Sequence, residues 1–493
     1  MGDAAIAVLP KADDLFINGR WTQSLGGGLE TVLNPATGRP LASVVSGTLG
    51  DAELAVEAAR RAFDDGPWPG LDRHERIRAV ERIHAALLAR RAEIQRLVQL
   101  ECGYTAAEAF NQFTQAERHT RRFLEIAQAD PTASLPISIT AAGAGKTLSA
   151  GVTTRVPIGV VVAITPYNAG FFLAAMKVIP ALLAGNTVIL KPSPFTPLQA
   201  FLFAEMAAAA DLPPGVFNLL TGDVNQAALL TSDARVDMVT FTGSDAVGAA
   251  IMAQAAPSLK KVHLELGGKS ALIVRADADL DLAVAKGLNF AWMCGQGCTH
   301  LTRHLVANSI RPAYVERLGE AVRKLKIGDP LDPAVQTGPL IREVARARSE
   351  RYVELGLNEG GRLVAGGRRP AGLGEGFFFE PTVFDGIQNH SRIAQEEIFG
   401  PIVCVIGFAD DAEAVRLANA SPFGLGGRII SRDVGAAMEM AMKVRTGTLS
   451  INNAGLLVDM PFGGFKRSGL GREWGEEGYK AYTELKAIAF NGG

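Results

Sequence analysis

The sequence predicts an α/β fold with parallel sheets, and three observations support this prediction. Short apolar runs rich in Val and Ile alternate with helical segments between residues 156 and 254. The 54 Gly and 25 Pro residues separate these runs and form no low-complexity tract. The 493 residues are 48% hydrophobic and 20% charged, which excludes a disordered chain. Strands and helices that alternate at this spacing form βαβ units on a parallel sheet.

A nucleotide site is predicted at one edge of the first sheet. We expect strands at 156–164, 187–191, 216–220 and 238–241, and helices at 171–184, 199–210 and 245–254. Right-handed crossovers place the loops after these strands at the carboxyl edge, where ligands of open α/β sheets bind. These loops, rich in Gly, Pro, Ser or Thr, are 165–170, 191–196, 221–223 and 242–245. The last loop opens a helix whose N-terminus can hold a phosphate, although turning and capping also explain such residues. The GxGxxG fingerprint is absent.

A second α/β unit is expected from about Gly267 to Phe465. Its region contains expected strands at 262–266, 270–274, 304–308, 382–386 and 401–408, and a helix at 280–292. Short polar strands are expected at 134–155, and another strand at 483–490. Because exposed strand edges seek partners, these last segments suit pairing between subunits.

The charge balance and the cysteine count exclude several classes of protein. Lys and Arg number 49 and Asp and Glu number 51, a formal charge of −2, which argues against a nucleic-acid-binding protein. No apolar stretch is long enough to cross a bilayer, so we expect no membrane partner. Four cysteines and no secretory signal favour the cytoplasm.

The main candidate for chemistry is a cysteine in a glycine-rich loop. Cys298 lies in the segment 293–299, directly after an expected helix. A thiolate there can attack a carbonyl and form a covalent intermediate. Cys102 and Cys404 are expected to be small buried side chains. Cys294 and Cys298 do not indicate a metal site, because no matching His or Cys cluster follows.

Two polar residues at strand ends are further candidates. Glu265 ends an expected strand and precedes paired glycines, so it is either a buried site carboxylate or a solvated edge residue. Asn168 follows the first expected strand, where its amide either donates to an oxyanion or forms an Asx turn. The residues alone leave these alternatives open.

Seven motifs, in order along essentially the whole chain, resemble those of the aldehyde dehydrogenase superfamily. They are TPYN (165–168), VILKPS (188–193), FTGS (241–244), ELGGKS (265–270), GQGC (295–298), EEIFGP (396–401) and PFGGFKRSGLGRE (461–473). The resemblance implies a Rossmann-like nucleotide-binding domain at 1–133 and 156–266, and an α/β catalytic domain at 267–465. It also implies a small β oligomerisation arm at 134–155 and 483–493. The implied activity is oxidation of a small-molecule aldehyde to the carboxylic acid with NAD(P)+, by a homodimer or homotetramer.

The resemblance implies a role for each residue that matches a motif. Cys298 matches the nucleophile, Glu265 the general base and Asn168 the oxyanion donor. The implied nucleotide contacts are Thr165, Pro166, Lys191, Ser193, Gly222, Gly243, Ser244, Glu397 and Phe399. Apolar side chains at pocket positions suggest a hydrophobic aliphatic or aromatic aldehyde, unless these side chains are simply core. They are Phe172, Met176, Met293 and Leu456. No metal ion is implied.

Three positions depart from the family pattern. Members that prefer NAD+ often carry Glu three residues after the lysine matched by Lys191, and this chain has Pro194 there. The missing carboxylate leaves NADP+ open, with NAD+ favoured as the commoner choice. Tyr167 replaces the usual Trp of the first motif. His300 replaces a small residue, and it either lines the substrate tunnel, shifts the pKa of the thiol or points outward.

Three other functions compete with a hydrolytic dehydrogenase. A CoA-acylating relative resolves the thioester with a thiol, and the retained Glu265 argues against it. A semialdehyde-acid dehydrogenase needs arginines for a second carboxylate, and Arg303 and Arg428 keep this option open. An inactive binding protein on the same scaffold is disfavoured because the matched site residues are retained together.

Overall fold

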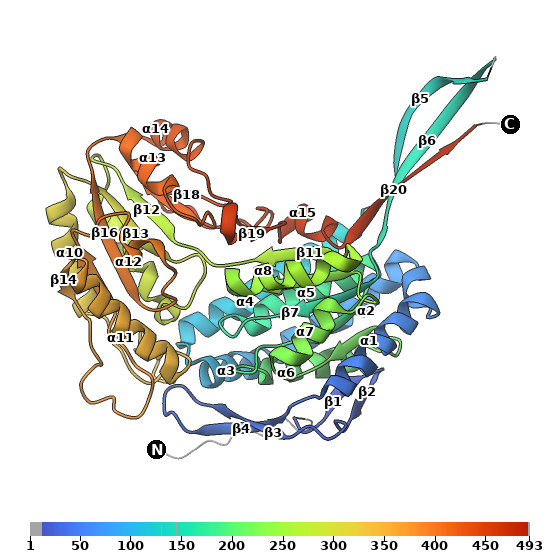
Figure 1. The fold of residues 1–493 in the computed structure, drawn as a ribbon, viewed down its shortest axis with the longest axis horizontal. Coiled ribbons are helices and arrows are strands. Elements are labelled where there is room, and N and C mark those ends of the chain that lie inside the picture. Colours follow the sequence, from blue (N-terminus) through green and yellow to red (C-terminus); the bar gives the residue numbers. More distant parts are fainter. Residues whose placement is uncertain (1–11, 130, 144, 492–493) are drawn as a thin grey trace.

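The computed structural model describes residues 12–129, 131–143 and 145–491. Two large sheets, of eight and seven strands, form the body of the molecule, and a three-stranded sheet projects from it (Figure 1). A two-stranded sheet pairs β3 (Leu29–Leu33) with β4 (Pro40–Val45). The predicted α/β class with parallel sheets is therefore confirmed. None of the helices in the described ranges is both long and apolar enough to cross a bilayer.

The first large sheet has five parallel strands at its centre. In sheet order they are β11 (Lys261–Glu265), β10 (Met238–Thr242), β7 (Val160–Ile164), β8 (Thr187–Lys191) and β9 (Phe217–Leu219). The antiparallel edge strands are β1 (Leu15–Ile17), β2 (Arg20–Thr22) and β19 (Gly469–Leu470). Every residue of β7, β8 and β10 is buried, as expected for parallel strands that helices cover on both faces.

Helices pack around this sheet and fix the loops that follow its strands. They are α1 (Leu49–Asp64), α2 (Arg73–Ala89), α3 (Arg91–Cys102), α4 (Ala106–Ala127), α5 (Gly170–Ala184), α6 (Leu198–Ala208), α7 (Val224–Ser232), α8 (Asp245–Ala255) and α15 (Gly475–Lys480). Because β7, β8, β9 and β10 are parallel neighbours, the loops after them meet at one carboxyl edge. The predicted grouping of these loops is confirmed, and Glu265 ends β11 at the same edge.

The second large sheet runs from residue 270 to residue 451. Its strands, in sheet order, are β14 (Arg362–Ala365), β15 (Thr382–Asp385), β16 (Ile402–Phe408), β13 (Leu301–Ala307), β12 (Ser270–Val274), β17 (Gly427–Ile430) and β18 (Ser450–Ile451). Its helices are α9 (Leu280–Gly287), α10 (Arg311–Arg323), α11 (Glu343–Asn358), α12 (Arg392–Gln395), α13 (Asp411–Asn419) and α14 (Val434–Ala441). β14 alone pairs antiparallel in this sheet, at its edge.

The projecting arm is longer than the sequence predicts. In place of short strands, a hairpin of β5 (Ala133–Ala142) and β6 (Gly145–Pro157) extends from the body, and β20 (Thr483–Phe490) pairs antiparallel with β6 (Figure 1). The expected strand at 156–164 is split, because β6 ends at Pro157 and β7 begins at Val160. Gly159 makes the break at φ +141°, where a Cβ would collide with the Asp237 carboxylate.

The expected helix at 280–292 is also wrong in its second half. The α-helix α9 ends at Gly287, and a 3₁₀ segment follows over Leu288–Gly295. Trp292, Met293 and Cys294 have non-helical dihedral angles within that segment. The sequence therefore stays apolar past the end of α9. Met293 and Cys294 are buried there although their backbone is not helical.

Candidate active site

The loop that carries Cys298 has an unusual backbone. Met293, Cys294 and Gly295 have φ values of 52°, 49° and 75°, so three consecutive residues are left-handed. This conformation costs a non-glycine residue about 1–2 kcal/mol, and the surrounding contacts must offset that cost. At Gly295 a Cβ would also lie 2.1 Å from the backbone carbon of Gly400. Close packing at Gly295 therefore constrains the sequence of this loop, in addition to the chemistry of the nucleophile.

Buried side chains hold this loop in place. The carboxyl of Glu108, at the N-terminal turn of α4, accepts a hydrogen bond from the Met293 N–H. Gln296 Nε2 donates to the Met293 carbonyl over 3.1 Å, and Gln296 Oε1 accepts from the Ile341 N–H over 2.9 Å. Burial raises the pKa of Glu108 to about 7. These bonds tie the loop to α4 and to the segment before α11.

We expect Gly295→Ala to disrupt both the loop and the reaction. The left-handed alanine costs about 1–2 kcal/mol and the backbone collision about 1–3 kcal/mol more. The free energy of unfolding in urea should therefore fall by about 2–5 kcal/mol, with loss of turnover. Gly28→Ala is the control, because a Cβ at Gly28 meets nothing within 4 Å. Equal stability of the two variants would contradict this account of the loop.

Cys298 is half-buried and faces Glu265. Its pKa is raised well above the usual value, first by burial and then by the charge of Glu265, which also accepts the thiol hydrogen bond. The Cys298 carbonyl packs against the β11–β12 connection, since a Cβ at Gly268 would lie 2.4 Å from that oxygen. Burial and the neighbouring carboxyl of Glu265 therefore favour the neutral thiol over the thiolate at Cys298.

Glu265 is a buried carboxyl with a raised pKa. It is 2% exposed, and burial together with the neighbouring charge of Glu473 raises its pKa to about 8. Lys177 lowers that pKa, and its ammonium forms a fully buried ion pair with Glu473 at 2.6 Å. Oε1 of Glu265 has no hydrogen-bond partner among the described residues. The solvated-edge alternative for Glu265 is wrong, and the carboxyl has one oxygen free for a ligand or water.

Asn168 contacts the nucleophile loop through its side-chain amide. Nδ2 donates to the Gln296 carbonyl over 2.8 Å, two residues before Cys298. Gln112 Nε2 donates to the Asn168 carbonyl over 3.1 Å and fixes its position from α4. Asn168 is 6% exposed. The Asn168 side chain is thus fixed against the loop that carries Cys298.

The other three cysteines are fully buried, unlike Cys298. Cys294 is fully buried and packs in the core of the second sheet. Cys102 accepts a hydrogen bond from Gln199, and Cys404 lies within the buried strand β16. Burial raises the pKa of each of these thiols. The prediction that Cys102 and Cys404 are small core residues is confirmed.

The residues expected to contact a nucleotide gather at the carboxyl edge of the first sheet. Lys191 Nζ donates to the Gly222 carbonyl over 2.8 Å and to the Pro192 carbonyl over 3.3 Å. Burial lowers the pKa of Lys191 to about 8. Ser244 caps α8, and the Gly243 N–H donates to the Glu265 carbonyl over 3.0 Å. Thr165, Pro166 and Ser193 lie in the two loops that follow β7 and β8.

Glu397 and Phe399 approach this edge from the second sheet. Glu397 Oε1 accepts from the Gly268 N–H over 2.8 Å, and burial raises its pKa to about 7. Phe399 has φ 55°, and its ring lies edge-on to Tyr167 at 5.9 Å. Both residues therefore lie between the two sheets, close to the nucleophile loop.

His300 is buried against the loop that it follows. A Cβ at Gly297 would lie 2.5 Å from His300 Nε2, and His300 is 4% exposed. Burial lowers the pKa of His300 to about 4, so the ring is neutral near pH 7. The outward alternative for His300 is wrong, and a neutral ring supplies no charge to the thiol.

The four apolar pocket candidates do not share one environment. Met176 is 1% exposed within the core of the first sheet. Met293 packs with Val98, Cys102, Tyr104 and Ala109. Phe172 is half-buried, with its ring 6.2 Å from that of Trp474. Leu456 lines a cavity of about 760 Å³. The core interpretation therefore holds for both methionines, and only Leu456 faces this cavity.

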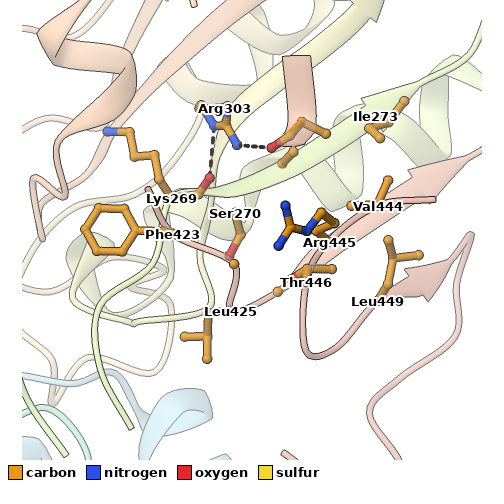
Figure 2. Close-up of a pocket in the computed structure, with 15 residues that line it drawn as sticks. Lys269, Ser270, Ile273, Arg303, Phe423, Leu425, Val444, Arg445, Thr446 and Leu449 are labelled. Atoms are coloured by element: carbon orange, nitrogen blue, oxygen red, sulfur yellow. Dashed lines mark hydrogen bonds between the residues drawn. The ribbon is translucent and has the colours of Figure 1, made fainter. Parts of the chain in front are cut away.

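Arg303 does not act as a second-carboxylate anchor in this structure. It is 2% exposed, and it donates to Asn389 Oδ1 and to the carbonyls of Lys269, Leu417 and Ala418. Figure 2 shows its guanidinium at a cavity of about 20 Å³, which is roughly the space of one water. These bonds go to the protein itself, so Arg303 joins the segment before β12 to α13 and to the segment before α12. Arg428 is the arginine that lines the larger cavity.

Three residues that the sequence motifs did not single out surround Glu265 and Asn168. They are Gln112 in α4, Lys177 in α5 and Glu473 in the segment before α15. A signal existed for Lys177, which is the single charged residue in the apolar helix α5. Among the described residues, no group of three or more His, Cys, Asp or Glu side chains could hold a metal ion.

Comparisons with known proteins match this arrangement. The family model described as "Aldehyde dehydrogenase family" matches residues 21–488. Betaine aldehyde dehydrogenase of Bacillus subtilis is 36% identical over 486 residues, covering 97% of each chain. 3-Sulfolactaldehyde dehydrogenase of Pseudomonas putida is 37% identical over 480 residues, covering 97% of this chain and 96% of its own.

A solved structure agrees over the same length. Betaine aldehyde dehydrogenase of Staphylococcus aureus, in complex with NAD+, superposes with a TM-score of 0.95 at 34% identity, covering 100% of this chain and 97% of its own. The family match, these relatives and the cysteine–glutamate pair agree, so this chain is an enzyme of the aldehyde dehydrogenase family.

Proposed function

We propose that this chain oxidises an aldehyde to the carboxylic acid through a thioester on Cys298, with NAD+ as the oxidant. The observation that carries the proposal is the contact between the half-buried Cys298 thiol and the buried Glu265 carboxyl. The relatives above are dehydrogenases named for a betaine aldehyde and a sulfolactaldehyde, so they agree on the reaction and differ in substrate.

The first half-reaction forms a bond between sulfur and the aldehyde carbon. The Cys298 thiol releases its proton to solvent water, which leaves Glu265 in its basic form, and Sγ of Cys298 attacks the carbonyl. The carbonyl electrons move to oxygen, where the free N–H of Asn168 stabilises the oxyanion. One such donor is commonly worth about 3–4 kcal/mol in the transition state. NAD+, when bound, accepts the hydride with its two electrons, and the thioester remains on Cys298.

The second half-reaction releases the acid. Glu265 takes a proton from a water molecule, which attacks the thioester carbon. The carbon–sulfur bond then breaks, the acid leaves and the sulfur regains its proton from Glu265. The free Oε1 of Glu265 is suited to this step, because no protein group competes with water for it among the described residues.

The residues at the carboxyl edge suit a dinucleotide. Lys191 Nζ uses two of its three protons on carbonyls, which leaves one for a ribose hydroxyl. The N-terminus of α8 can accept a phosphate, since Ser244 caps it and Gly243 precedes it. Glu397 has one oxygen bonded to Gly268, and its other oxygen can accept from the second ribose.

Pro194→Glu should increase the preference for NAD+ over NADP+. Pro194 is exposed, three residues after Lys191. A carboxylate there gains bonds to the ribose hydroxyls and repels a 2′-phosphate. The ratio of kcat/KM for NAD+ to that for NADP+ should rise about tenfold or more. Pro194→Gln is the control, because it can bond to the ribose without the negative charge. An unchanged ratio in Pro194→Glu would refute this role.

We propose that the domain limits implied by the resemblance apply here. The nucleotide-binding domain is 1–133 with 156–266, the catalytic domain is 267–465, and the arm is 134–155 with 483–493. Residues 1–11, 130, 144 and 492–493 fall outside the described ranges. The arrangement of the two large sheets supports these limits.

We further propose that the arm assembles a homodimer or homotetramer. Its large exposed apolar side chains support this assembly, because a lone chain leaves them in water. They are Leu135, Ile137, Ile139, Leu148, Leu485, Ile488 and Phe490. Light scattering on the full chain distinguishes a monomer, a dimer and a tetramer. The four free thiols support a reducing compartment such as the cytoplasm.

An aldehyde panel tests the proposed function directly. Purified enzyme is mixed with NAD+ or NADP+ and with aliphatic, aromatic and acid-bearing aldehydes, and the absorbance of reduced nicotinamide is followed. We expect stoichiometric conversion of at least one aldehyde to its carboxylic acid. Formation of an acyl-CoA only when CoA is added would instead identify the CoA-acylating alternative.

A further inference from the structure

A cavity of about 760 Å³ lies beside the nucleophile loop. Trp292 and Thr299 of that loop line it, together with Leu456 and the start of β17. Thr299 follows Cys298 directly, so their Cα atoms are about 3.8 Å apart. The volume of the cavity is in the range of small-molecule sites, about 300–1,000 Å³. The cavity is therefore placed and sized to hold the part of a substrate that lies away from the reacting carbon.

The charged residues that line this cavity are both positive. They are Lys286 and Arg428, and the lining contains no Asp or Glu. Neither side chain forms an ion pair with a carboxylate in the part of the chain that the structure describes. Burial lowers the pKa of Arg428, with no neighbouring charge that offsets the effect. Half-buried cations without a counter-charge are costly in a folded protein unless a ligand supplies that charge.

Arg428 is held close to the nucleophile loop by the sheet. A Cβ at Gly426 would lie 3.9 Å from the Thr299 Cβ. Gly426 directly precedes β17 and lies two residues before Arg428, which is about 6.5 Å along an extended chain. Arg428 donates one bond to the Asn452 carbonyl, which leaves most of its guanidinium protons available. The guanidinium can thus bond a ligand in the cavity that Thr299, the residue after Cys298, also lines.

Neutral donors accompany these two cations. Thr337 is fully buried in the cavity wall, and its hydroxyl has no hydrogen-bond partner among the described residues. Ser450 stands beside Arg428 in the register of β17 and β18, and it also lines the cavity. A buried hydroxyl without a partner costs free energy, so its presence in the wall points to a ligand or water oxygen.

We propose that this cavity binds the anionic end of an aldehyde acid, with Arg428 as its main partner and Lys286 as the second positive charge. The inference rests on the proposed function and names the class of its substrate, a short aldehyde that carries a terminal carboxylate. It differs from the hydrophobic aldehyde expected from the sequence, because Met176 and Met293 are core and both charged side chains of the cavity wall are cations.

The test compares two aldehydes of equal length, one with a terminal carboxylate and one that is neutral. The substrates are 4-oxobutanoate and its neutral amide, 4-oxobutanamide, and the readout is the ratio of their kcat/KM values with NAD+. The wild-type ratio should favour the carboxylate by about tenfold or more, because a charge-assisted bond is lost with the amide. The ratio should fall as salt is raised from about 0.05 M to about 0.5 M.

Three variants locate the effect. Arg428→Gln should lower the ratio by at least about tenfold, and Arg428→Lys should retain part of it as a point charge. Lys286→Gln should lower it by a smaller factor. Arg432→Gln is the matched control, because Arg432 is an exposed arginine four residues further along the chain. A wild-type ratio near one, or equal ratios in Arg428→Gln and Arg432→Gln, would overturn the proposal.

A binding measurement separates this inference from the proposed reaction. Succinate should raise the melting temperature of the wild-type enzyme, whereas succinamide should not. The shift should disappear in Arg428→Gln and persist in Arg432→Gln. If no aldehyde is oxidised, the proposed function is wrong. The change in melting temperature with succinate still tests the anion site in that case. The absence of that shift in the wild-type enzyme would count against the site even if neutral aldehydes are oxidised.

Discussion

Cys298→Ala should reduce aldehyde oxidation by at least about a thousandfold, because no other group can form the thioester. Of the four cysteines, Cys298 is the one that is half-buried, and its thiol faces the Glu265 carboxyl. Removal of the sulfur should also abolish the first burst of reduced nicotinamide. The measurement is steady-state turnover together with a stopped-flow trace of that burst.

Cys294→Ala is the matched control for this loss. Cys294 lies four residues earlier in the same loop, but it is fully buried in the core of the second sheet. We expect it to retain turnover within about threefold and to lose some stability, since the substitution leaves a small cavity. A comparable loss of turnover in both variants would refute the assignment of the nucleophile.

Glu265→Gln should slow acid release far more than the hydride burst. General-base catalysis typically contributes about 10²–10⁴-fold, so turnover should fall by that order while the burst persists. Glutamine keeps the size of the side chain and removes its ability to accept a proton. Rapid-quench analysis of the acylated enzyme measures the second step separately. A trace in which the burst itself is lost would count against a role confined to the second step.

The pH dependence of the second step follows from the raised pKa of Glu265. Burial and Glu473 raise that pKa to about 8, so the basic form gains population as pH rises toward 8. The rate of acid release should therefore increase with pH below about 8 and level off above it. Glu265→Gln should lose this rising limb. If the rate of acid release still rises with pH in Glu265→Gln, the titrating group is a different residue.

The parallel strands were the most predictable part of the fold. Residues 160–164 and 187–191 are buried on both faces, and such strands are nearly continuous apolar runs rich in Val and Ile in the sequence. The end of α9 was not predictable, because apolar side chains continue through the left-handed residues Met293 and Cys294. Periodicity reports burial and does not distinguish a helix from an irregular segment that is equally buried.

The site was predicted in part, and its missing members have a common reason. Motifs located Cys298, Glu265 and Asn168, which the fold brings together. The ion pair of Lys177 with Glu473 joins residues 296 positions apart in the sequence. Local patterns cannot predict such a contact, although a lone lysine in an apolar helix marks a buried charge that needs a partner. The sequence alone offered both Arg303 and Arg428 as partners for a substrate carboxylate. In the fold Arg303 is bonded to the protein itself, and Arg428 lines the cavity of about 760 Å³.

Mass spectrometry of the enzyme quenched during turnover tests the central claim most directly. We expect a chain heavier by one acyl group, with the added mass on the peptide that contains Cys298. The adduct should accumulate in Glu265→Gln and be absent from Cys298→Ala. An acyl group on Cys294 or on another residue, or sustained turnover with no acylated enzyme in either form, would contradict it.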